Sequence, residues 1–180
     1  MSGFSVNSAL KWSTMAIPIL LLAILFISML FDLRTRQVPA VLTLGSLLGA
    51  AIFSLWQGNW SPVVLVVALI WISDWEPQAK RLAFSTAAAA FACIFQPAVS
   101  LLCLAIFALW MLWEFDLIGG ADVKLLMAAL LIFGNAALLL PVAMAGGVLG
   151  VLALLRKQRQ IPYVPAIFAG STLFWITQIF

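Results

Sequence analysis

Apolar runs broken by short polar intervals make up almost the whole chain. The first run covers about Trp12–Phe31 and ends at the charged stretch Asp32–Arg36, and a second, Val38–Trp56, ends at Gln57–Ser61. About twenty apolar residues are enough for a helix to cross the hydrocarbon core of a bilayer. Because backbone groups in lipid must bond within their own helix, this pattern predicts membrane-spanning helices.

The later runs predict further helices of less regular length. Pro62–Ser73 is short and could be either a tilted span or a re-entrant helix. Leu82–Trp113 is too long for one span, and Gln96-Pro97 predicts a hairpin in its middle. Three more runs follow: Leu125–Phe133, Ala136–Leu155 and Tyr163–Phe180. We therefore predict one integral-membrane domain over residues 1–180, an all-α polytopic transmembrane bundle of six to eight spans.

Composition narrows the chemistry. Residues are 66% hydrophobic and only 8% charged, whereas soluble proteins are about 25% charged. The chain has no histidine, which excludes Ser–His and Cys–His nucleophile pairs and the usual His-based zinc sites. We expect no metal or other cofactor. Cys93 and Cys103 lie in apolar runs and are predicted to be small hydrophobic filler. A net charge of +3 is too small to indicate a nucleic-acid partner. Without histidine or a reactive cysteine, any catalysis would depend on carboxylates.

The basic residues predict an orientation. If the chain crosses eight times, beginning outside, only Lys11 lies outside, and the loops around Gln57–Ser61, Gln96 and Gly134-Asn135 carry no charge. A six-crossing alternative leaves Lys80 and Arg81 undecided. Asp32 and Asp122 are cytoplasmic in both. The basic residues placed inside by eight crossings are Arg34, Arg36, Lys80, Arg81, Lys124, Arg156, Lys157 and Arg159.

Of the six acidic residues, Asp32 and Asp122 border hydrophobic helix most closely. A carboxylate within a membrane helix costs roughly 2.5–3.5 kcal/mol, which favours a functional role. The structural alternative is that Asp32 caps a helix end and Asp122 stabilises a helix N-terminus through its dipole.

The other four acidic residues carry weaker predictions. Asp74 and Glu76 are predicted to form a solvated turn with Lys80 and Arg81. Glu114 and Asp116 are predicted to be interfacial, with substrate contact as an alternative.

Three short stretches favour a functional role over a structural role for the two aspartates. Asp32–Pro39 reads DLRTRQVP, Gly119–Leu126 reads GGADVKLL, and Ile161–Ile167 reads IPYVPAI. Glycines beside Asp122 would let backbone and substrate approach the carboxylate closely. In this order, the stretches resemble the motifs of the type IV prepilin peptidases, membrane aspartyl proteases of the GxGD class.

The resemblance implies a site. Asp32 and Asp122 match the catalytic aspartates of that family, and its terminal motif is matched by Pro162, Tyr163, Pro165 and Ala166. It departs at Ala121, where the family has glycine, and at Ala40, where the family often has asparagine. Gly119 and Gly120 would support the loop. Arg34, Arg36 and Lys124 would either set orientation or steer an acidic feature of the substrate.

The resemblance also implies a function. The enzyme would remove the cytoplasmic leader peptide from prepilins or pseudopilins, at the cytoplasmic face of the bacterial inner membrane. The cysteine-rich insertion of the bifunctional relatives is missing, which resembles the short, peptidase-only form serving Flp-type pili. Membrane lipid and other pilus-assembly proteins are the further expected partners. The resemblance does not decide which aspartate is the base.

Two other classes remain open. A small transporter or ion- or proton-binding membrane protein could use the same two aspartates. A structural assembly subunit could use Gly146, Gly147 and Gly150 as a helix-packing face.

Overall fold

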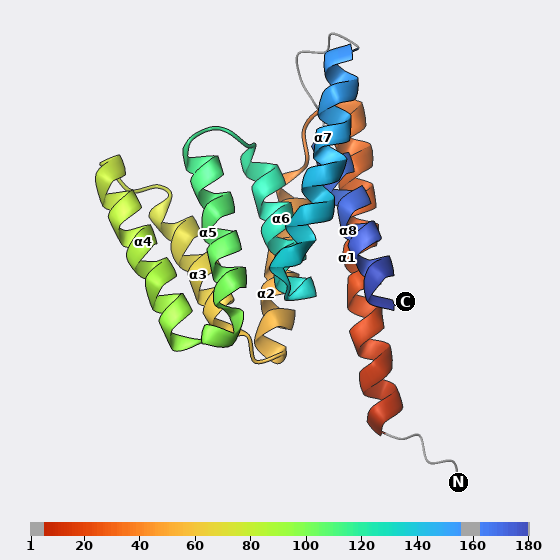
Figure 1. The fold of residues 1–180 in the computed structure, drawn as a ribbon, viewed down its shortest axis with the longest axis horizontal. Coiled ribbons are helices and arrows are strands. Elements are labelled where there is room, and N and C mark those ends of the chain that lie inside the picture. Colours follow the sequence, from red (N-terminus) through yellow and green to blue (C-terminus); the bar gives the residue numbers. More distant parts are fainter. Residues whose placement is uncertain (1–5, 156–162, 180) are drawn as a thin grey trace. The chain divides into compact units, whose positions relative to one another are not determined.

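The computed structural model describes residues 6–155 and 163–179, with side chains from residue 16 onward. Every regular element in these ranges is helical: eight α-helices and two short 3-10 helices (Figure 1). The all-α prediction is therefore confirmed. The helices divide into two compact units, a central unit of residues 39–139 and a terminal unit of residues 1–38 with 140–180. The single peptidase domain stays a prediction.

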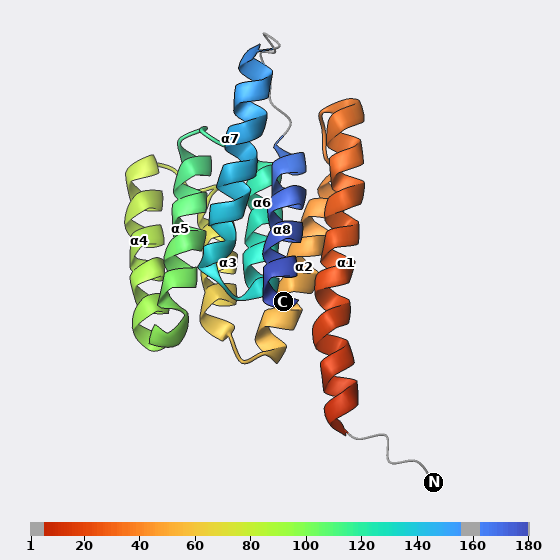
Figure 2. The ribbon, with the colours of Figure 1, turned by 45° about the vertical axis from the view of Figure 1, so that its right-hand side comes forward.

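The central unit is an up-and-down bundle in which neighbouring helices run antiparallel (Figures 1 and 2). Its elements are α2 (Ala40–Trp56), α3 (Trp60–Ile72), α4 (Gln78–Phe95), η1 (Pro97–Val99), α5 (Ser100–Glu114), α6 (Gly120–Phe133) and η2 (Ala136–Leu138). Helix α6 packs against α2, α3 and α5. Nearly all its residues from Val123 to Ile132 are buried, as expected for a helix that is apolar on every side.

Two turns of the central unit form where the sequence predicted breaks. Gln96 ends α4, and its side chain joins two turns: Oε1 accepts from Ser61 N at 3.2 Å and Nε2 donates to Gly58 O at 3.1 Å. Gly134 ends α6 in the left-handed region, with φ of 62°, where glycine has no steric penalty.

Charge gathers at one end of the central unit. The end formed by the last turns of α3 and α5 and the first turns of α4 and α6 (Figure 1) holds every charged residue of the unit, and we call it the charged end. The opposite turns, at residues 57–59, 96 and 134–135, carry none. The residues of the charged end are Asp74, Glu76, Lys80, Arg81, Glu114, Asp116, Asp122 and Lys124.

In the terminal unit, α1 (Val6–Thr35) packs against α8 (Val164–Ile179). Helix α7 (Leu139–Leu155) approaches α8 so closely that a Cβ on Gly170 would lie 2.5 Å from the Cα of Val142. Of the predicted glycine face, Gly146 is closely approached, since a Cβ there would lie 3.1 Å from Cε2 of Tyr163, the residue before α8, while Gly147 has nothing within 4 Å. Gly170, which the sequence analysis did not single out, is the most closely approached of the glycines in the described helices.

Three of the described helical segments are long and apolar enough to cross a membrane: Ala16–Thr35, Pro97–Glu114 and Ala136–Leu155. Three shorter apolar helices, α2, α3 and α8, accompany them. Large apolar side chains such as Val41 (82% exposed) and Leu154 (77% exposed) lie on helix surfaces, as is usual for proteins whose solvent is lipid. These are features of a membrane protein, and the count of six to eight spans stays a prediction.

Candidate functional site

Asp32 lies in the last turn of α1, half-buried, and its carboxylate reaches the start of α8. Oδ2 accepts a hydrogen bond from the backbone N–H of Val164 at 3.3 Å. The first N–H groups of a helix have no partner within the helix, and their dipoles favour a negative charge. Asp32 therefore caps α8, and this bond joins the first and third sequence motifs.

The third motif leaves that N–H available for Asp32. Ala166 N and Ile167 N both donate to Tyr163 O, at 2.9 and 3.2 Å, and Pro165 has no N–H to satisfy. Val164 is the remaining donor of the first turn, and it is completely buried. The sequence Tyr-Val-Pro-Ala thus directs one backbone donor at one carboxylate. Pro162, predicted to belong to this motif, lies outside the described residues, as do Arg156, Lys157 and Arg159.

The basic turn after Asp32 is built by the end of α1. Arg36 has a left-handed φ of 54°, and its N–H donates to Asp32 O at 2.9 Å. Thr35 Oγ1 donates to Phe31 O at 2.9 Å. Arg34 and Arg36 are both exposed, and Arg36 is the one whose backbone N–H is bonded to Asp32.

Asp122 lies in the first turn of α6, also half-buried, where the helix dipole favours a carboxylate. Gly119 precedes this helix with ordinary extended angles, φ −63° and ψ 140°. A Cβ on Gly119 would lie 3.2 Å from Oδ2 of Asp122. Gly119 therefore makes room for the Asp122 carboxylate, and it is not needed for an unusual backbone conformation.

Gly120 makes room for a different side chain, that of Trp113. A Cβ at this position would lie 2.9 Å from Nε1 and 3.1 Å from Cε2 of Trp113. Lys124 Nζ lies 5.3 Å from the centre of the same indole, within cation–π range. The sequence analysis missed Trp113, because it is one of eight tryptophans and ends a long apolar run.

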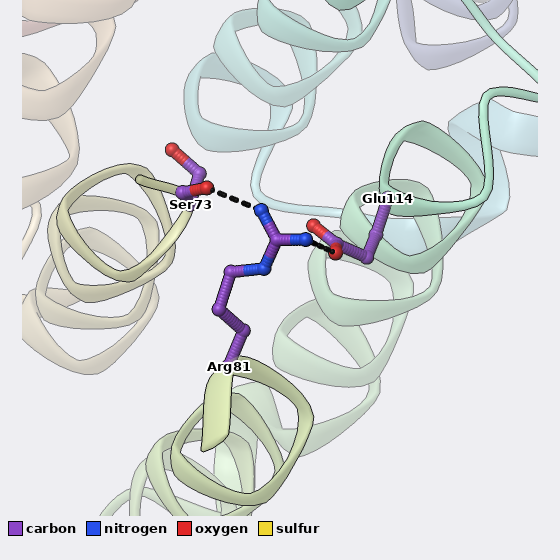
Figure 3. Close-up of polar contacts among 3 residues, drawn as sticks. All are labelled: Ser73, Arg81 and Glu114. Carbon is purple, nitrogen blue, oxygen red and sulfur yellow. Dashed lines mark hydrogen bonds and ion pairs between the residues drawn. The ribbon is translucent and has the colours of Figure 1, made fainter. Parts of the chain in front are cut away.

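The predicted solvated turn is wrong for Arg81, which is bonded within the protein. Helix α4 begins at Gln78, so Arg81 lies in its first turn and reaches across to α5 (Figure 3). Its Nη2 lies 2.7 Å from Glu114 Oε1, and its Nη1 donates to Ser73 O at 2.8 Å. Only 7% of the Glu114 side chain is exposed, and its predicted interfacial position stays a prediction. Asp74, Glu76 and Lys80 are exposed, as predicted.

A cavity of ≈ 240 Å³ lies beside this ion pair at the charged end. Trp113 is shared between the cavity wall and the first turn of α6. The cavity is therefore adjacent to the segment that carries Asp122. Its lining residues are Ser73, Asp74, Arg81, Trp113, Glu114 and Asp116.

The cysteines are packing residues, as predicted. Cys103 is completely buried, with Sγ 3.6 Å from Ser61 Oγ. Cys93 is half-buried and its Sγ lies 3.7 Å from Ser100 O. Both are free thiols.

The structure thus brings the predicted residues together in two groups. Asp32, Val164 and their neighbours form one group in the terminal unit, and Asp122, Gly119, Gly120 and Lys124 form the other in the central unit. The catalytic pairing of Asp32 with Asp122 stays a prediction. No family model, curated protein or solved structure matches the chain.

Proposed function

We propose that the protein is a membrane aspartyl endopeptidase that removes the leader peptide from prepilins or pseudopilins, with Asp32 and Asp122 as its catalytic pair. The observation that carries the proposal is the hydrogen bond from Val164 to Asp32. It makes one site from two motifs that lie 132 residues apart and that the type IV prepilin peptidase resemblance assigns to one function.

The chemistry requires two carboxylates that share one proton. Such a pair titrates as a unit, because one charged carboxylate disfavours the second charge. The ionised member takes a proton from water as the water oxygen attacks the scissile carbonyl carbon. The protonated member donates to the developing oxyanion. Either aspartate can fill either role in this scheme.

The charged end supports the choice of substrate. Asp122 lies where apolar helices meet a charged surface, and a prepilin has its cleavage site where a charged leader meets an apolar helix. Packing the substrate helix along the enzyme's apolar helices would align the bond and lower the entropic cost of reaction. The proposal places the enzyme in the bacterial inner membrane, with six to eight spans, the short apolar helices among them. Its active site would face the cytoplasm.

The basic residues acquire different roles in this proposal. The contact of Lys124 with Trp113 favours local packing over steering of substrate. Arg36 is bonded to Asp32 through its backbone N–H and helps to shape the turn after the carboxylate. Arg34 is exposed and contributes to orientation.

The proposal is tested by co-expression with an Flp-type prepilin, read as a gel shift. We expect wild type to cleave, and Asp32→Asn and Asp122→Asn each to lower the rate by at least about a hundredfold, as for loss of an acid–base group. Glu76→Gln is the control, because Glu76 is an exposed carboxylate outside the proposed pair and outside the lining of the cavity, and it should cleave normally.

Equal membrane abundance of all four proteins makes the comparison valid. Wild-type cleavage by either Asp32→Asn or Asp122→Asn would remove that residue from the pair. Failure of the wild type to cleave any Flp-type prepilin, together with proton or cation flux in vesicles that needs both aspartates, would favour the transporter alternative.

A further inference from the structure

Trp113 is the next-to-last residue of α5 and is followed by the loop that leads to Asp122. The loop folds back onto α5: Asp116 N donates to Trp113 O and Leu117 N donates to Leu112 O, both at 2.9 Å. These bonds fix the backbone after Trp113, and the indole itself contacts Gly120 at the start of α6. Trp113 is therefore held by its own helix on one side and meets the Asp122 segment on the other.

The indole contacts two residues that flank Asp122. Gly120 lies two residues before it and approaches Nε1 and Cε2 of the ring so closely that a Cβ would lie 2.9 and 3.1 Å from them. Lys124 lies two residues after it, with Nζ 5.3 Å from the ring centre. Residues four apart share a helix face, so Gly120 and Lys124 present one face of the first turn to Trp113.

Asp122 belongs to another face of the same turn. With 3.6 residues per turn, a residue two positions away is rotated by about 200° from both Gly120 and Lys124. Its carboxylate lies toward Gly119, whose Cβ would lie 3.2 Å from Oδ2. Trp113 thus fixes the helix turn from behind while the carboxylate projects from the other side.

We infer that Trp113 is a positioning residue for Asp122: its indole, packed on Gly120 and Lys124, sets the rotation and height of the first turn of α6. This inference rests on the proposed function of Asp122. It also explains why both neighbouring positions are glycine. Gly119 leaves space for the carboxylate, and Gly120 leaves space for the ring that holds the turn.

The first test measures kcat and KM on an Flp-type prepilin with the full-length protein in membranes. Trp113→Ala should lower kcat by about tenfold to a hundredfold, the scale expected for misplacing a reactive group by up to about 1 Å, with KM nearly unchanged. Trp113→Phe retains a ring for Lys124 and should recover most of the loss. Trp71→Ala is the matched control, because Trp71 is 71% exposed on α3.

The second test asks whether the contact with Gly120 is the cause. Gly120→Ala should lower kcat because its Cβ would collide with the indole. The same substitution in a Trp113→Phe background should cost much less, because the smaller ring lacks the atoms that collide. An equal cost in both backgrounds would overturn the inference.

The results separate the inference from the proposed function. Asp122→Asn is measured beside these variants, and its cleavage at the wild-type rate would refute the function of Asp122, and the inference with it. If Asp122→Asn is inactive but Trp113→Ala keeps the wild-type kcat per folded molecule, only the positioning inference fails. A lower abundance of Trp113→Ala with unchanged kcat would show a purely structural role and would also overturn it.

Discussion

Asp32 and Asp122 are held in opposite ways. Asp32 ends a helix, where the dipole disfavours a carboxylate. The N-terminus of α8 offsets this unfavourable interaction by donating a hydrogen bond from Val164, 132 residues further along the chain. Asp122 begins a helix, where the dipole is favourable, and it is placed by neighbours within ten residues, Gly119 and Trp113. Asp32 therefore depends on the docking of two distant helices, whereas Asp122 depends on a local turn.

The largest expected contrast comes from removing the donor to Asp32. Val164→Pro deletes the N–H at the first position of α8, where proline is well tolerated. Hydrogen bonds to charged groups contribute about 1.5–3 kcal/mol, so cleavage should fall by about tenfold to a hundredfold. The measurement is the cleavage rate per unit of folded protein in membranes.

Val164→Ala is the control for that variant, because it trims the buried side chain and keeps the N–H. It should retain most activity at equal abundance. If Val164→Pro and Val164→Ala lose the same activity, the hydrogen bond is unimportant and only packing at this position matters.

A smaller effect is expected from the equivalent local change beside Asp122. Gly119→Ala would bring a Cβ to 3.2 Å from Oδ2 of Asp122, so the carboxylate must move by a few tenths of an ångström. We expect cleavage to fall about fourfold, a fraction of the roughly hundredfold loss for a 1 Å displacement.

Gly147→Ala is the matched control for this change, because a Cβ there has nothing within 4 Å. It should cleave at the wild-type rate. A loss in Gly147→Ala as large as that in Gly119→Ala would mean that the effect is general to glycine replacement and not specific to the carboxylate.

The smallest effect is expected at Lys124. Lys124→Met keeps an apolar stem over Trp113 and removes the cation, whose contact with the ring is worth about 0.5–1 kcal/mol. The cleavage rate should fall about twofold to fivefold for every prepilin tested. A loss confined to prepilins that carry an acidic residue near the cleavage site would instead show that Lys124 steers substrate.

The sequence predicts the helix breaks better than the helix starts. Gln96-Pro97 and Gly134 break helices in the structure as expected, because proline and a left-handed glycine act locally. The start of α4 lies earlier than predicted, at Gln78 and not at Leu82. Its first turn reads as loop in the sequence, because the pairing of Arg81 with Glu114 that supports the charge there is not visible locally.

Contacts between helices were beyond sequence reasoning. Nothing in the local pattern distinguishes Trp113 from the other tryptophans, pairs Arg81 with Glu114, or singles out Gly170 as the close contact of α7 and α8. Such pairings depend on which faces meet after folding. The motif residues were found because their order of charge, glycine and proline resembles the motifs of a known family.

The central claim is that two differently supported aspartates perform one reaction, and a double-mutant comparison tests it most directly. Cleavage rates on one Flp-type prepilin are measured for Asp32→Asn, Asp122→Asn and the double variant, at equal membrane abundance. Catalytic groups that act as a unit are strongly non-additive, so the double variant should be no slower than the slower single variant. Losses that multiply in the double variant would show that the aspartates act independently and would contradict the proposed pair.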